Sequence, residues 1–365
     1  MAFDAAGFRA EFPVFESVSF LNAGSEGPVP RVAGDAVRAR IDSELRGRGG
    51  HASFQEVLGL ADRVRPAYAA VLGADPSDVA LTGSTTDGCN TVIAGLELGP
   101  GDEIVTSDEE HPGLLAPLAQ ARRRRGVSIT VAPFAEVHAA VGPATKLIAC
   151  SHVSWVGGKV SDVAALVGTG VPVLLDGAQA LGAIPVDVRA LGVDYYAAPG
   201  QKWLCGPEGS GSLYVRRERL DELAVPWSGF GSLADPHDPL DCGPAEGAKR
   251  FDHGFPAGIR SAFALASLEM LASYGWDAVF ERAATLATRL ADDLAGHGLA
   301  VAPRGRSTLV SWEASDAEAE VARLAAGGFV TRFIPATFRY VRASVGAWCS
   351  EDELARLVEL AAGQG

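Results

Sequence analysis

The ten residues from 171 to 180, Val-Pro-Val-Leu-Leu-Asp-Gly-Ala-Gln-Ala, decide the fold of this chain. Every position from 171 to 175 is apolar, which is typical of a strand in a parallel sheet covered by helices on both faces. Asp176 follows at the carboxyl end of this strand, and open α/β sheets bind their ligands at that end. The stretch therefore predicts a helix-covered sheet with an acid at its ligand-binding edge.

Similar apolar segments precede this stretch and alternate with helical patterns rich in Ala and Leu. Strands are expected at 78–82, 102–106, 127–131 and 146–150, and helices at 87–98 and 113–125. Strands and helices that alternate in this way imply right-handed crossovers within one open sheet. The fold class is therefore α/β.

The character of the chain changes after about residue 230. Residues 227–249 hold several Gly, Pro and Asp residues and are expected to form a long loop. Helices are expected at 259–274 and 276–297, strands at 309–312 and 340–344, and a last helix after Ser350, which stands three residues before Glu353 as in a capping box. We expect a large α/β domain over residues 15–240 and a small α+β domain formed by residues 1–14 and 241–365.

Composition narrows the class of protein. The 365 residues carry 31 Lys and Arg against 45 Asp and Glu, a net charge of −14 that argues against a nucleic-acid partner. The five cysteines show no paired spacing, and no apolar run reaches the roughly 18 residues of a membrane span. The seven histidines are scattered, so no metal site is expected. These features predict a cytoplasmic protein without a membrane partner.

Lys202 is one of only four lysines and lies in the segment Gly-Gln-Lys-Trp-Leu-Cys-Gly, residues 200–206. The glycines let the backbone approach a bound group closely. A lysine among small and apolar residues loses hydration, which lowers its pKa and favours the free amine that can condense with an aldehyde. Taken alone, the segment could equally be a surface turn.

Asp176 strengthens the chemical interpretation of Lys202. A buried acid needs a cationic or hydrogen-bonding partner to stay ionised, and a protonated pyridine nitrogen is such a partner. One short αβ unit separates the two residues, so they could reach opposite ends of one aromatic ring.

Two further strand-to-helix segments supply polar groups. Residues 82–90, Thr-Gly-Ser-Thr-Thr-Asp-Gly-Cys-Asn, would place hydroxyls and helix N–H groups around an anion such as phosphate, or would simply cap the helix. His111 follows another predicted strand and could stack on a flat cofactor ring.

These segments resemble the class V aminotransferase family of pyridoxal-phosphate (PLP) enzymes over nearly the whole chain. The resemblance rests on residues 20–28 (Phe-Leu-Asn-Ala-Gly-Ser-Glu-Gly-Pro), 176–180, 193–196 and 341–344 (Val-Arg-Ala-Ser). It implies a fold type I PLP-dependent transferase, whose large domain holds a mainly parallel seven-stranded sheet, and a homodimer with PLP as cofactor.

The resemblance also implies roles for individual residues. Lys202 would form the Schiff base with PLP and carry the catalytic proton. Asp176 would contact the pyridine nitrogen, Gln179 the phenolic oxygen, and His111 the ring face. Phosphate-binding positions of the family are occupied by Thr85, Thr86 and Gln201.

The expected substrate is an amino acid. By resemblance, Arg342 would grip its carboxylate, Arg332 would form the second arginine of a pair found in the cysteine/cystine C–S lyase branch, and Trp155 would stand where a carboxylate-contacting Asn is common. That branch is favoured, with β-elimination to pyruvate, ammonia and a sulfur product. An aminotransferase or an isopenicillin-N-epimerase-like enzyme is the alternative, and a PLP-bound scaffold is the non-enzyme alternative.

A persulfide-forming cysteine desulfurase is less favoured. By resemblance, such an enzyme needs a nucleophilic thiolate on a loop upstream of the carboxylate-binding arginine, and no cysteine lies between Phe251 and Arg342. Cys242 in the long loop is the only thiol left open. Two departures from the family also matter: Pro199-Gly200-Gln201 replaces a common Ser-Gly-His, and Gly254-Phe255 replaces a Gly-Thr whose hydroxyl reaches the neighbouring subunit's phosphate. The second leaves that intersubunit contact open.

Overall fold

A seven-stranded sheet forms the centre of the computed structural model, which describes residues 3–252, 254, 256–335 and 338–363. The strand order is β2-β8-β7-β6-β5-β3-β4. The strands are β2 (Val79–Thr82), β3 (Glu103–Ser107), β4 (Ser128–Ala132), β5 (Thr145–Ser151), β6 (Val173–Asp176), β7 (Tyr195–Pro199) and β8 (Gly211–Val215). β8 pairs antiparallel with β2 and β7, and the other pairs are parallel. The prediction of a mainly parallel seven-stranded sheet is confirmed.

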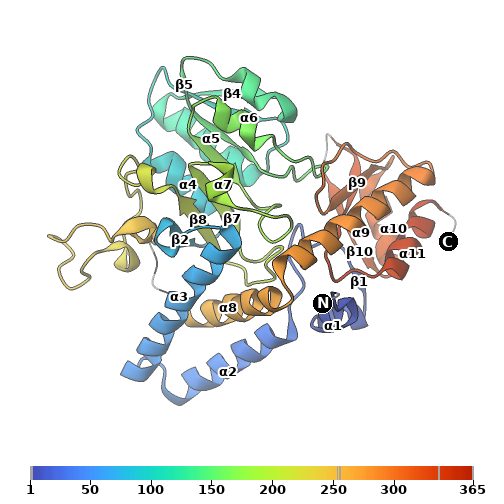
Figure 1. Cartoon of the computed structure of the whole chain (residues 1–365), viewed down its shortest axis with the longest axis horizontal. Helices are drawn as coiled ribbons and strands as arrows, with labels where there is room; N and C mark the ends of the chain where they lie inside the picture. Colours follow the sequence, from blue (N-terminus) through green and yellow to red (C-terminus); the bar gives the residue numbers. More distant parts are fainter. Residues whose placement is uncertain (1–2, 253, 255, 336–337, 364–365) are drawn as a thin grey trace.

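Helices cover both faces of this sheet (Figure 1). Leu174 of β6 packs into the core that includes α4 (Thr85–Gly95) and α5 (Pro112–Arg125). Its neighbours Val173 and Leu175 point the other way, into the core shared with α3 (His51–Leu72), α6 (Val163–Gly168) and α7 (Val188–Leu191). Successive side chains of a strand alternate between faces, so an uninterrupted apolar strand needs this double cover.

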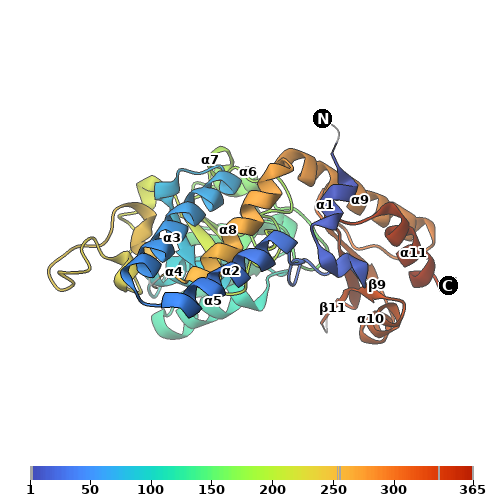
Figure 2. The ribbon, with the colours of Figure 1, turned by 90° about the horizontal axis from the view of Figure 1, so that it is seen from below.

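A smaller sheet follows in the C-terminal third. It is antiparallel, in the order β11-β12-β9, with β9 (Leu309–Glu313), β11 (Arg332–Ile334) and β12 (Tyr340–Ser344). Around it lie α9 (Trp276–Gly296), α10 (Ala317–Ala326) and α11 (Glu351–Ala361) (Figure 2). The expected capping box is present at the start of α11, where Ser350 and Glu353 bond each other's backbone N–H.

The N-terminal segment reaches this second unit. β1 (Ser19–Phe20) pairs in parallel with β10 (Phe329–Val330), and Arg9 of α1 (Ala5–Ala10) forms an ion pair with Glu353 at 2.8 Å. The long helix α8 (Gly258–Ser273) packs against α2 (Arg31–Gly47) and α3 (Figure 2). The division of the chain into residues 15–240 and the remainder stays a prediction.

The expected loop at 227–249 contains two short 3-10 turns, Phe230–Ser232 and the start of Gly247–Phe251, and one antiparallel bridge between Leu233 and Pro244. It projects beyond the sheet as the yellow segment in Figure 1. No helix in the described part of the chain is both long and apolar enough to cross a membrane.

The core around β6 should dominate stability. Leu175 is fully buried, and its replacement by Ala leaves a cavity beside a strand that is paired on both sides. We expect Leu175→Ala to lower the free energy of unfolding by about 2–5 kcal/mol in urea titrations. Leu240→Ala, at a side chain 94% exposed in the long loop, is the matched control and should change it by less than about 0.5 kcal/mol. Equal effects of the two variants would contradict the assigned core.

Candidate functional site

A cavity of about 280 Å³ opens at the carboxyl ends of the parallel strands. Every residue that the sequence suggested for cofactor or substrate binding lines it. These residues are Thr85, Thr86, His111, Trp155, Asp176, Gln179, Gln201, Lys202, Arg332 and Arg342. Ser84, from the segment 82–90 expected at an anion or a helix cap, lines it too, as do Gly24 and Ser25, for which the sequence predicted no role. The chain thus brings together eight separate stretches of sequence around one cavity, at positions 24–26, 84–86, 111–113, 155, 176–179, 199–202, 332 and 342.

Asp176 and Lys202 face the same cavity. Asp176 is the last residue of β6, is 5% exposed, and accepts a hydrogen bond from the Ala178 N–H at 2.8 Å. Loss of hydration raises the pKa of Asp176, while the charge of Lys202 lowers it. The pKa of Lys202 falls to about 8, chiefly through loss of hydration, against the opposing attraction of Asp176. The site therefore holds a lysine that is easily deprotonated beside a buried acid.

His111 lies at the N-cap of α5. Its Nδ1 accepts the Gly113 N–H at 3.0 Å, which leaves Nε2 as the protonated nitrogen of the neutral ring. Partial burial and the positive charges of Lys202, Arg332 and Arg342 lower the His111 pKa to about 4. The imidazole meets the Trp155 ring edge-on, with centroids 5.1 Å apart at 89°. A neutral imidazole can lie against an aromatic ring without placing a further cation there.

Gln179 is fixed from two sides. Its Nε2 donates to the Gly24 carbonyl at 2.8 Å, and its Oε1 accepts from the Trp203 indole N–H at 3.1 Å. Gly24 has to be a glycine, because a Cβ there would lie 2.9 Å from Arg342 Nη2 and 3.0 Å from Gln179 Oε1. This contact explains the glycine in the segment 20–28.

The start of α4 presents polar groups to the cavity. Ser84 is its N-cap, and the Ser84 Oγ accepts the Asp87 N–H at 3.1 Å. Thr85 and Thr86 form the first turn, where N–H groups and the helix dipole favour an anion. Gln201 lies across the cavity from another segment, beside Lys202. A phosphate group suits this end of the site.

Two arginines form the opposite wall. Arg332 on β11 and Arg342 on β12 are direct partners in the antiparallel pair. Arg342 is 1% exposed and donates from Nη1 to the Trp155 carbonyl at 2.5 Å, while Arg332 donates to Ser25 Oγ at 2.8 Å. Burial and the neighbouring Arg332 lower the pKa of Arg342 to about 9.

Neither arginine has an acidic partner among the residues that the structure describes. Arg342 Nε and Trp155 Nε1 are both buried donors without an acceptor in that part of the chain. Buried donors are rarely left unpaired, so their position in a cavity wall indicates a site for an anionic ligand group such as a carboxylate.

No described cysteine lines the cavity. Cys89, Cys150, Cys205 and Cys349 are buried, and Cys242 is half-buried in the long loop. No cluster of metal-binding side chains occurs among the described residues either. Phe255, on which the question of an intersubunit phosphate contact depends, lies outside the described residues.

The donor set fits PLP. Lys202 supplies an amine for the PLP aldehyde, and the start of α4 supplies N–H groups for the PLP phosphate. Asp176 supplies an acid for the ring nitrogen, and His111 and Gln179 supply an imidazole and an amide for the ring. The paired arginines are left over for a second, anionic molecule.

Comparisons with known proteins identify relatives of this chain. Cysteine desulfurase of Klebsiella pneumoniae (strain 342) is 33% identical over 257 residues, which cover 64% of this chain and 63% of the relative. Isopenicillin N epimerase of Streptomyces clavuligerus is 32% identical over 221 residues, 56% of this chain and 54% of the relative. The matches thus span less than two thirds of the length of either relative.

Solved structures match over the whole chain. A C-DES variant with glycine covalently linked to the PLP cofactor superposes with a TM-score of 0.92 at 29% identity, covering 98% of this chain and 99% of that one. C-DES, described as a cystine C–S lyase, in complex with its product cysteine persulfide gives a TM-score of 0.91 at 29% identity and covers 96% and 99%. The family model of class V aminotransferases matches residues 35–316, and the chain belongs to that family.

Proposed function

We propose that this protein binds PLP and cleaves a carbon–sulfur bond of a cysteine- or cystine-type amino acid by β-elimination. The observation that carries the proposal is the shared cavity of Lys202 and Asp176, which two arginines also line, neither with an acidic partner in the described part of the chain. The likeness to C-DES over 98% of the chain supports the lyase reaction in particular. The products would be pyruvate, ammonia and a sulfur compound.

PLP, when bound, supplies an electron-accepting ring that stabilises negative charge at the α-carbon of an amino acid. Lys202 would hold the cofactor's aldehyde and, once displaced by the substrate amine, remove the α-proton. Asp176, kept ionised by a positive ring nitrogen, would preserve the proton on that nitrogen. Neutral His111 would cover one face of the ring and exclude water.

The arginines would orient the substrate. Arg342 is held by the Trp155 carbonyl and presents a free Nε, so its guanidinium can bind a carboxylate without reorganising. Arg332 adds a second positive charge beside it. A cystine-type substrate carries two carboxylates, which suits a pair of arginines on adjacent strands.

The lack of a cavity thiol supports a lyase over a persulfide-forming desulfurase. Desulfurases and isopenicillin N epimerases are nevertheless among the similar sequences, so both reactions are outcomes that the assay must separate. Transfer of the substrate sulfur to Cys242 as a persulfide would indicate a desulfurase. Racemised substrate without pyruvate would indicate an epimerase, and a keto acid formed with an acceptor would indicate an aminotransferase.

The decisive assay uses purified protein with added PLP. We expect a visible absorption band, and pyruvate release from cystine or cysteine. Lys202→Ala should lose the band that depends on the lysine and lower the rate of pyruvate formation by a factor of at least about 10³, since it removes both the amine and the base. Cys242→Ser is the matched control and should keep the wild-type rate. A colourless wild-type protein would contradict the cofactor assignment.

The ionisation of Lys202 provides a test without substrate. With only four lysines, reductively ¹³C-methylated apoprotein gives few resonances, and Lys202→Arg identifies the one in the cavity. We expect its titration midpoint at a pH of about 8. In Asp176→Asn the midpoint should fall further, because the charge that favours the ammonium form is lost. A midpoint near 10.5 in both proteins would contradict the buried site.

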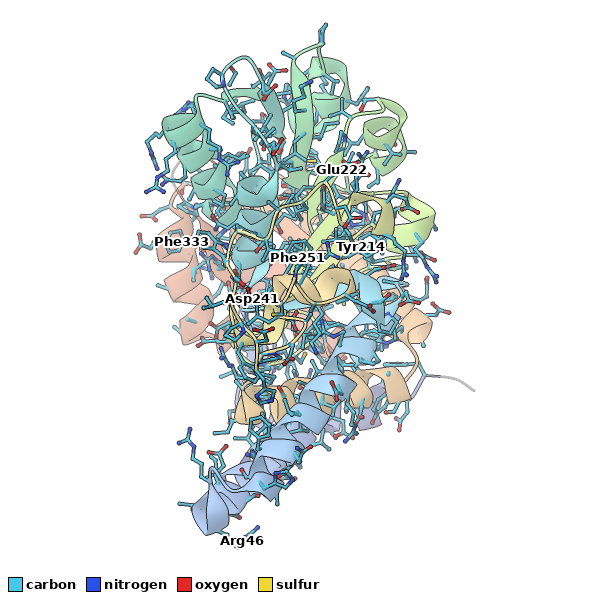
Figure 3. All side chains as sticks on the ribbon, turned by 90° about the vertical axis from the view of Figure 1, so that its left-hand side faces the viewer. Arg46, Tyr214, Glu222, Asp241, Phe251 and Phe333 are labelled. Atoms are coloured by element: carbon cyan, nitrogen blue, oxygen red, sulfur yellow. The ribbon has the colours of Figure 1, made fainter. Side chains whose placement is uncertain are left out.

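We also propose a homodimer in a reducing, cytoplasmic location. Ile41 and Leu45 on α2 and Phe54 on α3 are exposed, Leu45 by 80%, on helices that extend away from the sheet. Figure 3 shows Arg46 at the outer end of these helices. All five cysteines are unpaired, which suits a reducing compartment. A second copy would cover the apolar side chains of the two helices.

Light scattering after size exclusion checks this assembly. Wild-type protein should elute as two chains, and Ile41→Glu combined with Leu45→Glu should shift the population toward one chain, because two charges would be buried without partners. Leu240→Glu, in the long loop near the labelled Asp241 of Figure 3, should leave the mass unchanged. A monomeric wild-type protein would refute the proposal.

A further inference from the structure

Two buried acids, Glu109 and Glu110, precede His111 and point to different parts of the fold. Glu110 accepts the Ser151 N–H at 2.9 Å at the end of β5. Glu109 instead accepts from Ser154 Oγ and from Lys159 Nζ, the latter at 2.5 Å. The first acid fixes the His111 segment to the sheet, and the second connects it to another loop.

Glu109 holds both ends of that loop. The Ser154 N–H donates to the Lys159 carbonyl at 2.8 Å, so residues 154–159 form a closed turn. The carboxylate of Glu109 binds a side chain at its first residue and one at its last. Its side chain is only 10% exposed, whereas that of Lys159 is 35% exposed. An ion pair shielded on the acid's side is stronger than one on the surface.

The turn carries groups that belong to the candidate site. The Trp155 carbonyl accepts from Arg342 Nη1, and the Trp155 ring meets His111. The turn is also tied to the C-terminal unit, where Ser311 Oγ donates to the Val156 carbonyl at 2.6 Å. The orientation of the buried guanidinium therefore depends on where the turn places its backbone.

We propose that Glu109 is a positioning residue for substrate recognition. It acts through Ser154 and Lys159 on the turn, and through the Trp155 carbonyl on Arg342, so that the guanidinium meets the carboxylate of an amino acid. This inference rests on the proposed function, since it assumes an amino acid bound at Arg342. Glu109 itself touches neither substrate nor cofactor.

Loss of Glu109 should weaken binding of the substrate carboxylate selectively. Loss of the Glu109 charge removes the ion pair that ties the turn to the His111 segment, while Ser311 and Ser307 still hold its far side. The Trp155 carbonyl is then less firmly placed, which loosens Arg342. Lys202, Asp176 and Gln179 keep their own contacts, because none of them bonds to the turn. Binding of an amino acid should therefore weaken, while reaction of the cofactor with a simple amine should not.

The experiment compares glycine with methylamine on the PLP-loaded protein. Both carry an amine, but only glycine has a carboxylate, and spectral titration gives a dissociation constant for each. In Glu109→Gln we expect the glycine constant to rise about tenfold, as a small misplacement of a binding group can cost this much or more. The methylamine constant should stay within about twofold.

Lys159, the partner of Glu109 in the ion pair, offers a second variant that breaks the pair and a conservative variant that retains it. Lys159→Met should raise the glycine constant in the same way, and its half-exposed position makes it tolerable if Glu109→Gln fails to fold. Lys159→Arg retains the ion pair and should keep wild-type affinity. Glu281→Gln, which breaks the exposed pair with Arg306, is the matched control and should change neither constant.

The outcomes separate the inference from the proposed function. Equal weakening of glycine and methylamine binding, or unchanged glycine binding in both ion-pair variants, would overturn the positioning role alone. A wild-type protein without a visible band would overturn the proposed function and this inference with it.

Discussion

The structure depends on the burial of one acid at the end of one strand. Asp176 can be excluded from water only because β6 is covered on both faces, and it can remain charged only with a cation opposite. Lys202 is the one cation whose charge stabilises it in the cavity. The same burial lowers the pKa of that lysine to about 8, so the two residues shape each other's ionisation. The sheet, the cavity and the available amine are consequences of a single arrangement.

The alternating core could be predicted from the sequence because each apolar strand has to be buried. The strand expected at 146–150 is β5, and the helix expected at 113–125 is α5. β7 and β8 were not predicted, since Tyr-Tyr-Ala-Ala-Pro and Gly-Ser-Leu-Tyr-Val contain a proline and a glycine that are more typical of turns. These two residues face each other at the end of the pair, Pro199 opposite Gly211, where the strands separate toward the lysine segment. These two segments form strands because they pair within the sheet, and their own residues do not indicate this pairing.

The candidate site shows the same limit. Residues at strand ends, such as Asp176 and His111, could be found because topology places all such ends at one edge. Ser84 lies in the segment 82–90, whose hydroxyls were expected at an anion or a helix cap, but Gly24 gave no comparable signal. The need for glycine at position 24 arises from the approach of Arg342 and Gln179, which come from distant segments. The role of a polar side chain can be inferred from its chemistry in the sequence. A glycine that is needed because it has no side chain can be identified only when the folded structure shows which atoms approach it.

Positive charge collects in the cavity although the whole protein has a net charge of −14. Lys202, Arg332 and Arg342 face a single buried acid. Loss of hydration is the main cause of the lowered pKa of the lysine and of Arg342, and repulsion from neighbouring arginine charge lowers both further. An anionic group at the start of α4 and another at the arginines would relieve this repulsion. Each anion would then favour the protonated lysine, so substrate and cofactor would be linked electrostatically through Lys202 as well as by contact. The excess of positive charge in the cavity of this acidic protein is therefore best understood as the complement of the negative charge that the ligands would carry.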